Sequence, residues 1–377
     1  MTSKVTFIHC GAFFLVSITN SSGTPQRSTK RLSENGRSAA TSSVRLAPKQ
    51  SLVADQTSTQ RAIEYLLALK GENADKLLAD AGLKPRGTKV QAYDRLRSGV
   101  ASGKISLEQI QQWLEEVEGW GNHQIHLFDV TDAVCDRLSS KRKAVSLLSK
   151  LHLGHLLDAE RPLWPEQEPA IFRISFQESK LRVGWAQERI WKRREESEDY
   201  QDGDLWFNAY RIQHRRCFHY FELDTVTGKS SLIMSKLPSG DKYSDLKEKL
   251  LGDLDPIVSI NGLQIVDLRP AVLALESSDK VLRRRLNLIT NEQTRIEIIS
   301  NAIDHDAYDD PSIRKARKQW AGDVAASRGH FFWQITTGEV TRLIGTKLLP
   351  RENRFSIEGQ CSETEVAYVL QCMRAIS

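Results

Sequence analysis

The residue pattern of this 377-residue chain changes near residue 160, and that change most constrains how the chain can fold. Before it, apolar residues recur at helical spacing, as in 61–69 and 107–117. After residue 170, aromatic and β-branched residues form short runs separated by turn signals, which is typical of strands. Three prolines in 161–169 indicate a linker. The pattern predicts an α+β fold, in which a helical N-terminal part precedes a mixed antiparallel-sheet and helix region.

Length and turn signals divide the chain into five predicted parts, because 377 residues exceed one typical core. They are a disordered tail at 1–55, a helical module at 56–105, a helical connector with a short strand at 106–160, and two α+β halves at 170–255 and 279–377. The halves look similar, since each contains a hairpin, an aromatic strand, a Thr-Gly turn, a second strand and a helix. Two unrelated hairpin–helix units would give the same pattern, so a true repeat stays open.

Within the halves, individual elements can be predicted. Strands 171–176 and 181–191 should form a hairpin, and residues 311–326 a helix. The aromatic residues of the strands are expected to be sheet core rather than platforms for stacked bases. They are Trp185, Trp191, Trp206, Phe207, Phe218, Tyr220, Phe221, Phe331, Phe332 and Trp333.

The net charge of +5 comes from the first 50 residues, which hold seven Lys or Arg and one acid. The rest of the chain therefore sums to about −1, so any nucleic-acid contact must come from a local patch. The apolar stretch 5–18 weakly resembles a signal peptide, and 20–50 has the composition of a transit peptide. We expect this segment to be a disordered tail or an upstream extension, with targeting as the alternative.

The five cysteines lie far apart and form no CxxC pair, which favours a reducing compartment over a disulfide framework. No apolar run reaches the length of a membrane span. We therefore expect an intracellular protein, in the cytoplasm and nucleoid or in the nucleus, with no membrane contact.

Residues 77–97, LLADAGLKPRGTKVQAYDRLR, carry the most specific pattern of the chain. Two leucines precede Gly82-Leu83, which is followed by Gly87-Thr88-Lys89 and then by Arg95-Leu96. The stretch resembles the SAP motif, a short helix–loop–helix module of DNA-binding proteins, over about a tenth of the chain. The resemblance implies that the loop and the start of the second helix face the DNA backbone.

Physical chemistry supports the same assignment without the family name. A helix start presents free N–H groups and a partial positive charge, which suit a phosphate. Thr88 is a fair N-cap, Gly87 permits close approach, and residues 73–104 hold seven bases and three acids. Such contacts read the backbone and groove shape rather than the sequence of duplex DNA. The predicted DNA-binding residues are Lys84, Arg86, Gly87, Thr88, Lys89, Arg95 and Arg97.

The stretch departs from the family at two places. Ala92 stands where the family has a larger apolar residue, and Gly99, Ser102 and Gly103 predict a loose segment after the second helix. A helical hairpin whose charges are simply solvated is the alternative.

Other chemically capable residues have simpler structural explanations. Strand alternation puts His214 on one face and Cys217 with His219 on the other, and two ligands do not make a metal site. The acids around Asp306 precede Pro311, where a helix start favours negative charge. We therefore predict no metal, no cofactor and no catalytic residue.

The tripeptide Glu178-Ser179-Lys180, downstream of Pro165-Glu166, faintly resembles the PD-(D/E)xK nuclease pattern. In that pattern two carboxylates hold a metal and a lysine steadies the attacking water. The apolar face changes from even to odd positions across the tripeptide, which favours a turn. The family also has Asp where Glu166 stands.

Taken together, the residues predict a non-enzymatic DNA-associating protein. The SAP-like module would bind duplex DNA with little sequence preference, and the α+β region at 170–377 would contact another protein. Two alternatives stay open. One is a metal-dependent nuclease or other nucleic-acid-processing enzyme, and the other is a structural or assembly protein with no DNA contact.

Overall fold

The computed structural model shows both helices and a large antiparallel sheet, which confirms the predicted α+β class. Among the described residues, no helix is both long and apolar enough to cross a membrane. The structure describes residues 3–9, 12–18, 59–66, 78–84, 88–118, 120–202, 205–237, 242–291, 294–300, 305–319, 324–337 and 340–376.

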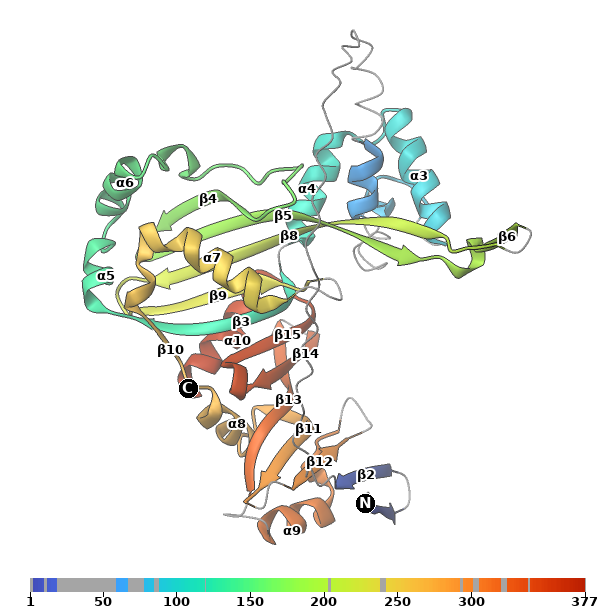
Figure 1. Cartoon of the computed structure of the whole chain (residues 1–377), viewed down its shortest axis with the longest axis vertical. Coiled ribbons are helices and arrows are strands. Elements are labelled where there is room, and N and C mark those ends of the chain that lie inside the picture. Colours follow the sequence, from blue (N-terminus) through green and yellow to red (C-terminus); the bar gives the residue numbers. More distant parts are fainter. Residues whose placement is uncertain are drawn as a thin grey trace, which may run out of the picture.

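The helices fall into one group at residues 59–117 and a second group that covers the sheet (Figure 1). The first group contains a helix at 59–66, a helical turn at 78–80, α3 (Lys89–Ala101) and α4 (Leu107–Val117). The second group is α5 (Asp132–Arg137), α6 (Lys141–Lys150), α7 (Tyr243–Val258), α8 (Arg269–Glu276), α9 (Pro311–Gln319) and α10 (Glu363–Ile376). Short 3-10 turns are η1 (Gly154–Leu156), η2 (Glu196–Glu198), η3 (Ile260–Gly262), η4 (Ala307–Asp309) and η5 (Pro350–Glu352).

Eleven strands form one sheet, in the order β12-β11-β13-β14-β15-β3-β9-β8-β5-β4, with β10 paired to β3. Their bounds are β3 (Gly121–Val130), β4 (Ala170–Gln177), β5 (Lys180–Arg194), β8 (Tyr210–Asp224), β9 (Lys229–Ser235), β10 (Leu263–Ile265), β11 (Val281–Thr290), β12 (Arg295–Ile299), β13 (Val324–Thr337), β14 (Val340–Leu349) and β15 (Arg354–Gln360). Two small hairpins form separate sheets: β1 (Ser3–His9) with β2 (Ala12–Ile18), which lies beside β12 (Figure 1), and β6 (Tyr200–Asp202) with β7 (Leu205–Phe207).

The two predicted halves contribute strands to this one sheet but connect them differently. In 170–255 the strands follow one another as neighbours, from β4 through β5 and β8 to β9. In 279–377 the strand β13 pairs with β11, the first strand of its hairpin, so the chain crosses β11 by way of α9. The predicted short strand of the connector, β3, joins the halves because it pairs with both β15 and β9.

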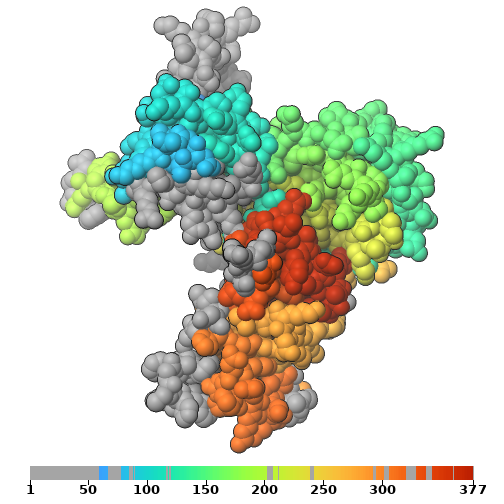
Figure 2. All heavy atoms as spheres, turned by 180° about the vertical axis from the view of Figure 1, so that it is seen from behind, coloured from blue at the N-terminus to red at the C-terminus, as the bar shows by residue number. Residues whose placement is uncertain are grey.

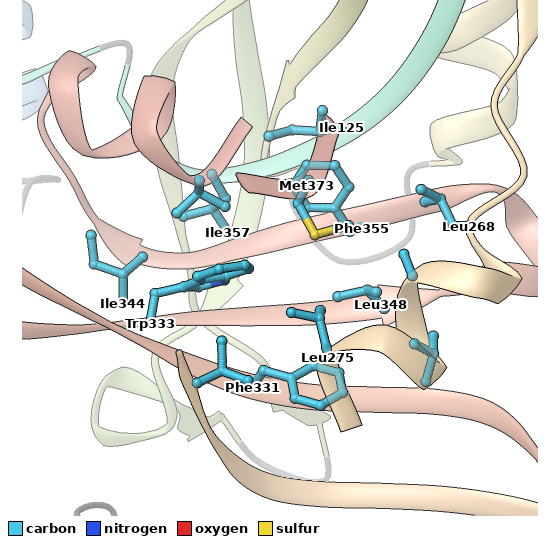
Figure 3. Packing of buried hydrophobic residues seen from close by; sticks show 14 of the residues in the cluster. Ile125, Leu268, Leu275, Phe331, Trp333, Ile344, Leu348, Phe355, Ile357 and Met373 are labelled. Carbon is cyan, nitrogen blue, oxygen red and sulfur yellow. The ribbon is translucent and has the colours of Figure 1, made fainter. Parts of the chain in front are cut away.

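Two apolar clusters hold helices on the sheet. One packs α5, α6 and α7 against residues such as Trp185 and Phe221 of the first half. The other packs α8 and α10 against the second half, where Trp333, Phe331 and Phe355 are at most 1% exposed (Figure 3). Burial of such side chains contributes about 1.5 to 3 kcal/mol each, so these clusters are the main source of sheet stability.

Most of the aromatic strand residues are core, as predicted. Trp185, Phe218, Phe221, Phe331 and Trp333 are at most 1% exposed. The prediction is wrong for Phe207, which is 39% exposed and stacks on Tyr200 at 4.7 Å. It lies beyond the sheet, where no second layer covers it.

Other predictions need correction. Ser3–His9 and Ala12–Ile18 pair as antiparallel strands within the segment predicted to be a disordered tail, and the remainder of 1–55 lies outside the described residues. The predicted helix at 311–326 ends at Gln319, since β-pairing with β11 claims residues from Val324 onward. The segment 161–169, predicted as a linker, contacts the sheet at its start, where Arg161 donates to the Tyr220 hydroxyl at 3.0 Å.

Candidate nucleic-acid interface

The helical module, defined here as residues 59–118, has its own small core. The helix at 59–66 contributes Ile63 and Leu66, α3 contributes Leu96, and α4 contributes Ile110 and Leu114, all at most 1% exposed. Ala92 is nearly buried at 9%, so the small residue is accommodated without opening the core. This packing fixes the start of α3, where the predicted DNA contacts gather.

The start of α3 is built as the sequence predicts. Thr88 is the N-cap and accepts the Gln91 amide at 3.3 Å, while the Gln91 side chain accepts the Thr88 amide at 3.2 Å. This reciprocal capping box satisfies the backbone amides of Thr88 and Gln91. The aligned peptide dipoles still give the start of α3 a partial positive charge.

The structure places some of the predicted DNA-binding residues and leaves others undescribed. Lys84 and Arg97 are exposed, and Thr88 caps α3. Arg95 donates from its guanidinium to the Lys84 carbonyl at 2.6 Å, so it braces the loop against the helix. Arg86 and Gly87 lie outside the described residues, as does the side chain of Lys89.

The segment after the second helix is tighter than its composition predicts. Gly99 lies within α3, and a Cβ there would meet the Ile105 side chain at 2.8 Å and Leu83 at 3.2 Å. The backbone amides of Lys104 and Ile105 both donate to the Gly99 carbonyl. Gly99 is therefore a close-packing position, because any side chain would collide with Ile105.

A buried carboxylate fastens the module to the sheet. Glu188 of β5 is 2% exposed and accepts from Arg61 Nε at 2.8 Å, from the Tyr65 hydroxyl at 2.5 Å and from His214 Nδ1 at 3.0 Å. Burial raises the pKa of Tyr65, so its hydroxyl keeps the proton it donates. Burial, helped by Arg61, lowers the pKa of His214, so a neutral imidazole donates to Glu188.

A second buried pair lies beside the first. Arg216 of β8 bonds to Glu118, which follows α4, and lies over the rings of Tyr65 and Phe218 at 5.4 Å from each. Burial raises the pKa of Glu118 against the opposing pull of Arg216. Nothing in the sequence signalled these pairs, because their members are 98 and 127 residues apart.

A cavity of about 770 Å³ lies on the sheet face next to α10. Its lining mixes charges, with Arg173, Lys229 and Arg374 facing Glu222 and Asp224. Arg182 crosses it and pairs with Glu222 at 2.6 Å and Glu363 at 2.5 Å. Because bases and acids alternate here, the cavity has no single charge preference.

The residues of the weaker sequence patterns have structural roles wherever the structure describes them. Glu178 has φ 54° in the turn between β4 and β5, and this confirms the turn interpretation. His219 is buried between Gln187 and the Ser235 amide, on the opposite face from His214. Within the described ranges, no three His, Cys, Asp or Glu side chains gather in a metal-binding arrangement.

The acids near Asp306 also serve local structure, as predicted. Asp306 caps η4 and pairs with Arg283, while Asp310 accepts the Ser312 amide at 2.7 Å at the start of α9.

Comparison with protein-family models gives no match, and no curated protein sequence matches the chain significantly. The function of the protein is therefore inferred from its own residues.

Proposed function

We propose that the protein associates with duplex DNA through the SAP-like helical module. The start of α3 carries the proposal, because the capped helix terminus lies in a segment of net charge +4 that also holds the exposed Lys84 and Arg97. Phosphate oxygens suit both the helix-end amides and these bases. Binding would have little sequence preference and would be modest for one module.

The sheet region is the proposed site of a protein partner. In support, its cavity offers both signs of charge, and such a surface suits a polar protein segment better than a polyanion. In this proposal the protein works inside the cell, at the nucleoid or in the nucleus. The module would recruit it to DNA, and the sheet would bring the partner.

The test is duplex binding by the full chain, measured by fluorescence anisotropy over a range of salt concentrations. Arg86→Ala with Lys89→Ala removes two predicted phosphate contacts, so the salt slope should become shallower by about 1.8. The matched control is Arg142→Ala with Lys150→Ala, which removes the same charges from exposed positions of α6. Equal slopes for the two variants would refute the proposed role of the module.

A further inference from the structure

The outer ends of β5 and β8 leave the sheet as a two-stranded ribbon. The strand β4 pairs with β5 only up to Ala186, and β9 pairs with β8 only from His219 onward. The pairing of β5 with β8 continues to Arg194 and Tyr210. We call residues 189–194 and 210–215 the ribbon shaft. It projects beyond the body of the protein beside the helical module (Figures 1 and 2).

The ribbon shaft holds a concentrated positive charge. Its sequences, RIWKRR and YRIQHR, contain no acid. Lys192, Arg193 and Arg194 are exposed, and Arg189 and Arg215 are partly exposed. The six bases are Arg189, Lys192, Arg193, Arg194, Arg211 and Arg215.

The register of the shaft places like charges opposite one another. Arg189 pairs with Arg215, and Arg193 with Arg211. The paired strands of the shaft therefore bring basic residues together at neighbouring register positions with no acid among them, and a polyanion would complement this charge.

Shape favours duplex DNA over other polyanions. The major groove, about 12 Å wide, admits a two-stranded β-ribbon, whose strands lie about 4.8 Å apart. Six residues of strand extend about 20 Å, enough to follow the groove past several phosphates. Apolar side chains between the bases are also exposed, with Ile212 at 57%, Tyr210 at 53% and Ile190 at 41%. Among the described residues no second layer covers these side chains, and the edges of the DNA bases would cover them.

The tip beyond the shaft has the opposite charge. Residues 195–204 contain six acids, and Asp199 pairs with Arg194 at 2.7 Å. Acids repel phosphates, so the tip should extend past the DNA while the shaft lies against it. Arg194 is paired with this acidic tip, so Lys192, Arg193 and Arg215 are the bases proposed to contact phosphates.

We infer that the ribbon shaft is a second DNA-contacting element, which lies in a groove of the duplex that the helical module recruits. The inference relies on the proposed function for the identity of the polyanion, although it uses different residues. Glu188, at the base of the ribbon, accepts hydrogen bonds from Arg61 and Tyr65 of the module and from His214 of the shaft, so both elements are held on one side of the protein.

The experiment compares three charge-matched double variants of the full chain in salt-dependent anisotropy with a labelled duplex. They are Lys192→Ala with Arg193→Ala in the shaft, Arg86→Ala with Lys89→Ala in the module, and Arg142→Ala with Lys150→Ala as control. The shaft variant should bind about 10- to 30-fold more weakly near 0.15 M salt, with a slope shallower by about 1.8. Its thermal stability should match the control, because both side chains are exposed.

The outcomes separate the two proposals. If the shaft variant behaves like the control while the module variant is weakened, the inference fails and the proposed function survives. If only the shaft variant is weakened, the inference survives and the role of the module fails. Polyglutamate of equal charge that competes as well as duplex, or a single strand that binds more tightly than duplex, would overturn the assignment to duplex DNA.

Substitutions in the acidic tip should change duplex affinity in the opposite direction. Glu196→Gln with Glu198→Gln changes two exposed side chains and removes repulsion near the shaft. Duplex binding should tighten several-fold at low salt and converge with that of the unaltered chain at high salt. An unchanged affinity would place the ribbon away from the duplex and contradict the inference.

Discussion

The helical module and the ribbon shaft are both basic, but they carry their charge in different ways. The module mixes bases with acids, and Arg95 already bonds to a backbone carbonyl. The shaft has six bases, no acid and opposed arginines. A helix end supplies partial charge from its backbone, whereas a β-ribbon has only a small net dipole. A ribbon must therefore place full charges on its side chains to attract an anion.

The two elements also differ in how they are stabilised. The module has a small apolar core of its own, whereas the shaft is held by its strand pairing and by the bonds of His214 to Glu188 and of Arg194 to Asp199. Two buried carboxylates, Glu188 and Glu118, join the module to β5 and β8, and Glu188 accepts from three donors. These hydrogen bonds fix the orientation of the module on the sheet, and the loss of one partner leaves the others unsatisfied.

The largest expected effect comes from breaking this junction. Glu188→Ala leaves Arg61 and the Tyr65 hydroxyl without their acceptor, and each donor that loses its partner costs about 1 to 3 kcal/mol. Urea denaturation should show that loss, and hydrogen exchange at 59–66 should accelerate. The control is Glu198→Ala at the exposed tip, which should change stability little. Equal denaturation midpoints for both variants would show that the junction contributes nothing.

Acid should destabilise the sheet more than the module, because residues 59–118 contain no histidine. Burial lowers the pKa of His219 to about 3 and that of His126 to about 4, with contributions from His123 to the former and Lys247 to the latter. The unfolded chain titrates near pH 6.5, so it takes up protons first. Stability is therefore complete above about pH 6.5 and falls below it, by roughly 1.4 kcal/mol per pH unit for each histidine.

Denaturation at pH 7, 6 and 5 measures this loss. His126→Gln retains a donor for the Asn353 carbonyl, which His126 Nδ1 contacts at 3.0 Å, and should remove about half of the acid sensitivity. His155→Gln alters an exposed histidine and should leave the pH dependence unchanged. If both variants lose stability in acid as the unaltered chain does, another group is responsible.

The smallest effect concerns packing inside the module. Gly99→Ala forces a Cβ against Ile105, and overpacking of this kind costs about 1 to 3 kcal/mol. Gly252→Ala in α7 meets nothing within 4 Å and should stabilise its helix by about 0.5 to 1 kcal/mol. Thermal denaturation should therefore show destabilisation by Gly99→Ala and stabilisation by Gly252→Ala. A stabilising Gly99→Ala would mean that α3 can shift away from Ile105.

Local features of the fold could be predicted from the sequence because neighbouring residues decide them. Thr88 with Gln91 and Ser106 with Gln109 form capping boxes, and Glu178 occupies a turn. Each depends on a spacing of three residues or on a change in alternation. The position of Asp310 at a helix start follows in the same way.

The site was predictable only in part. The sequence indicated the start of α3, but it did not reveal that Arg95 binds the Lys84 carbonyl or that Glu188 holds Arg61. The second of these contacts spans 127 residues, and no local pattern records it. The length of β5 was also underestimated, since the prediction ended at Trp191 and the strand reaches Arg194.

The sequence by itself determined where helices begin, where the chain turns, and that positive charge gathers near α3. Only the tertiary structure decided that β3 joins the two halves, that β13 pairs across its hairpin, and that β5 and β8 outrun their neighbours. The reason is physical. Capping and turns depend on residues a few positions apart, whereas strand order and strand exposure depend on pairings between distant segments, which compete over the whole chain.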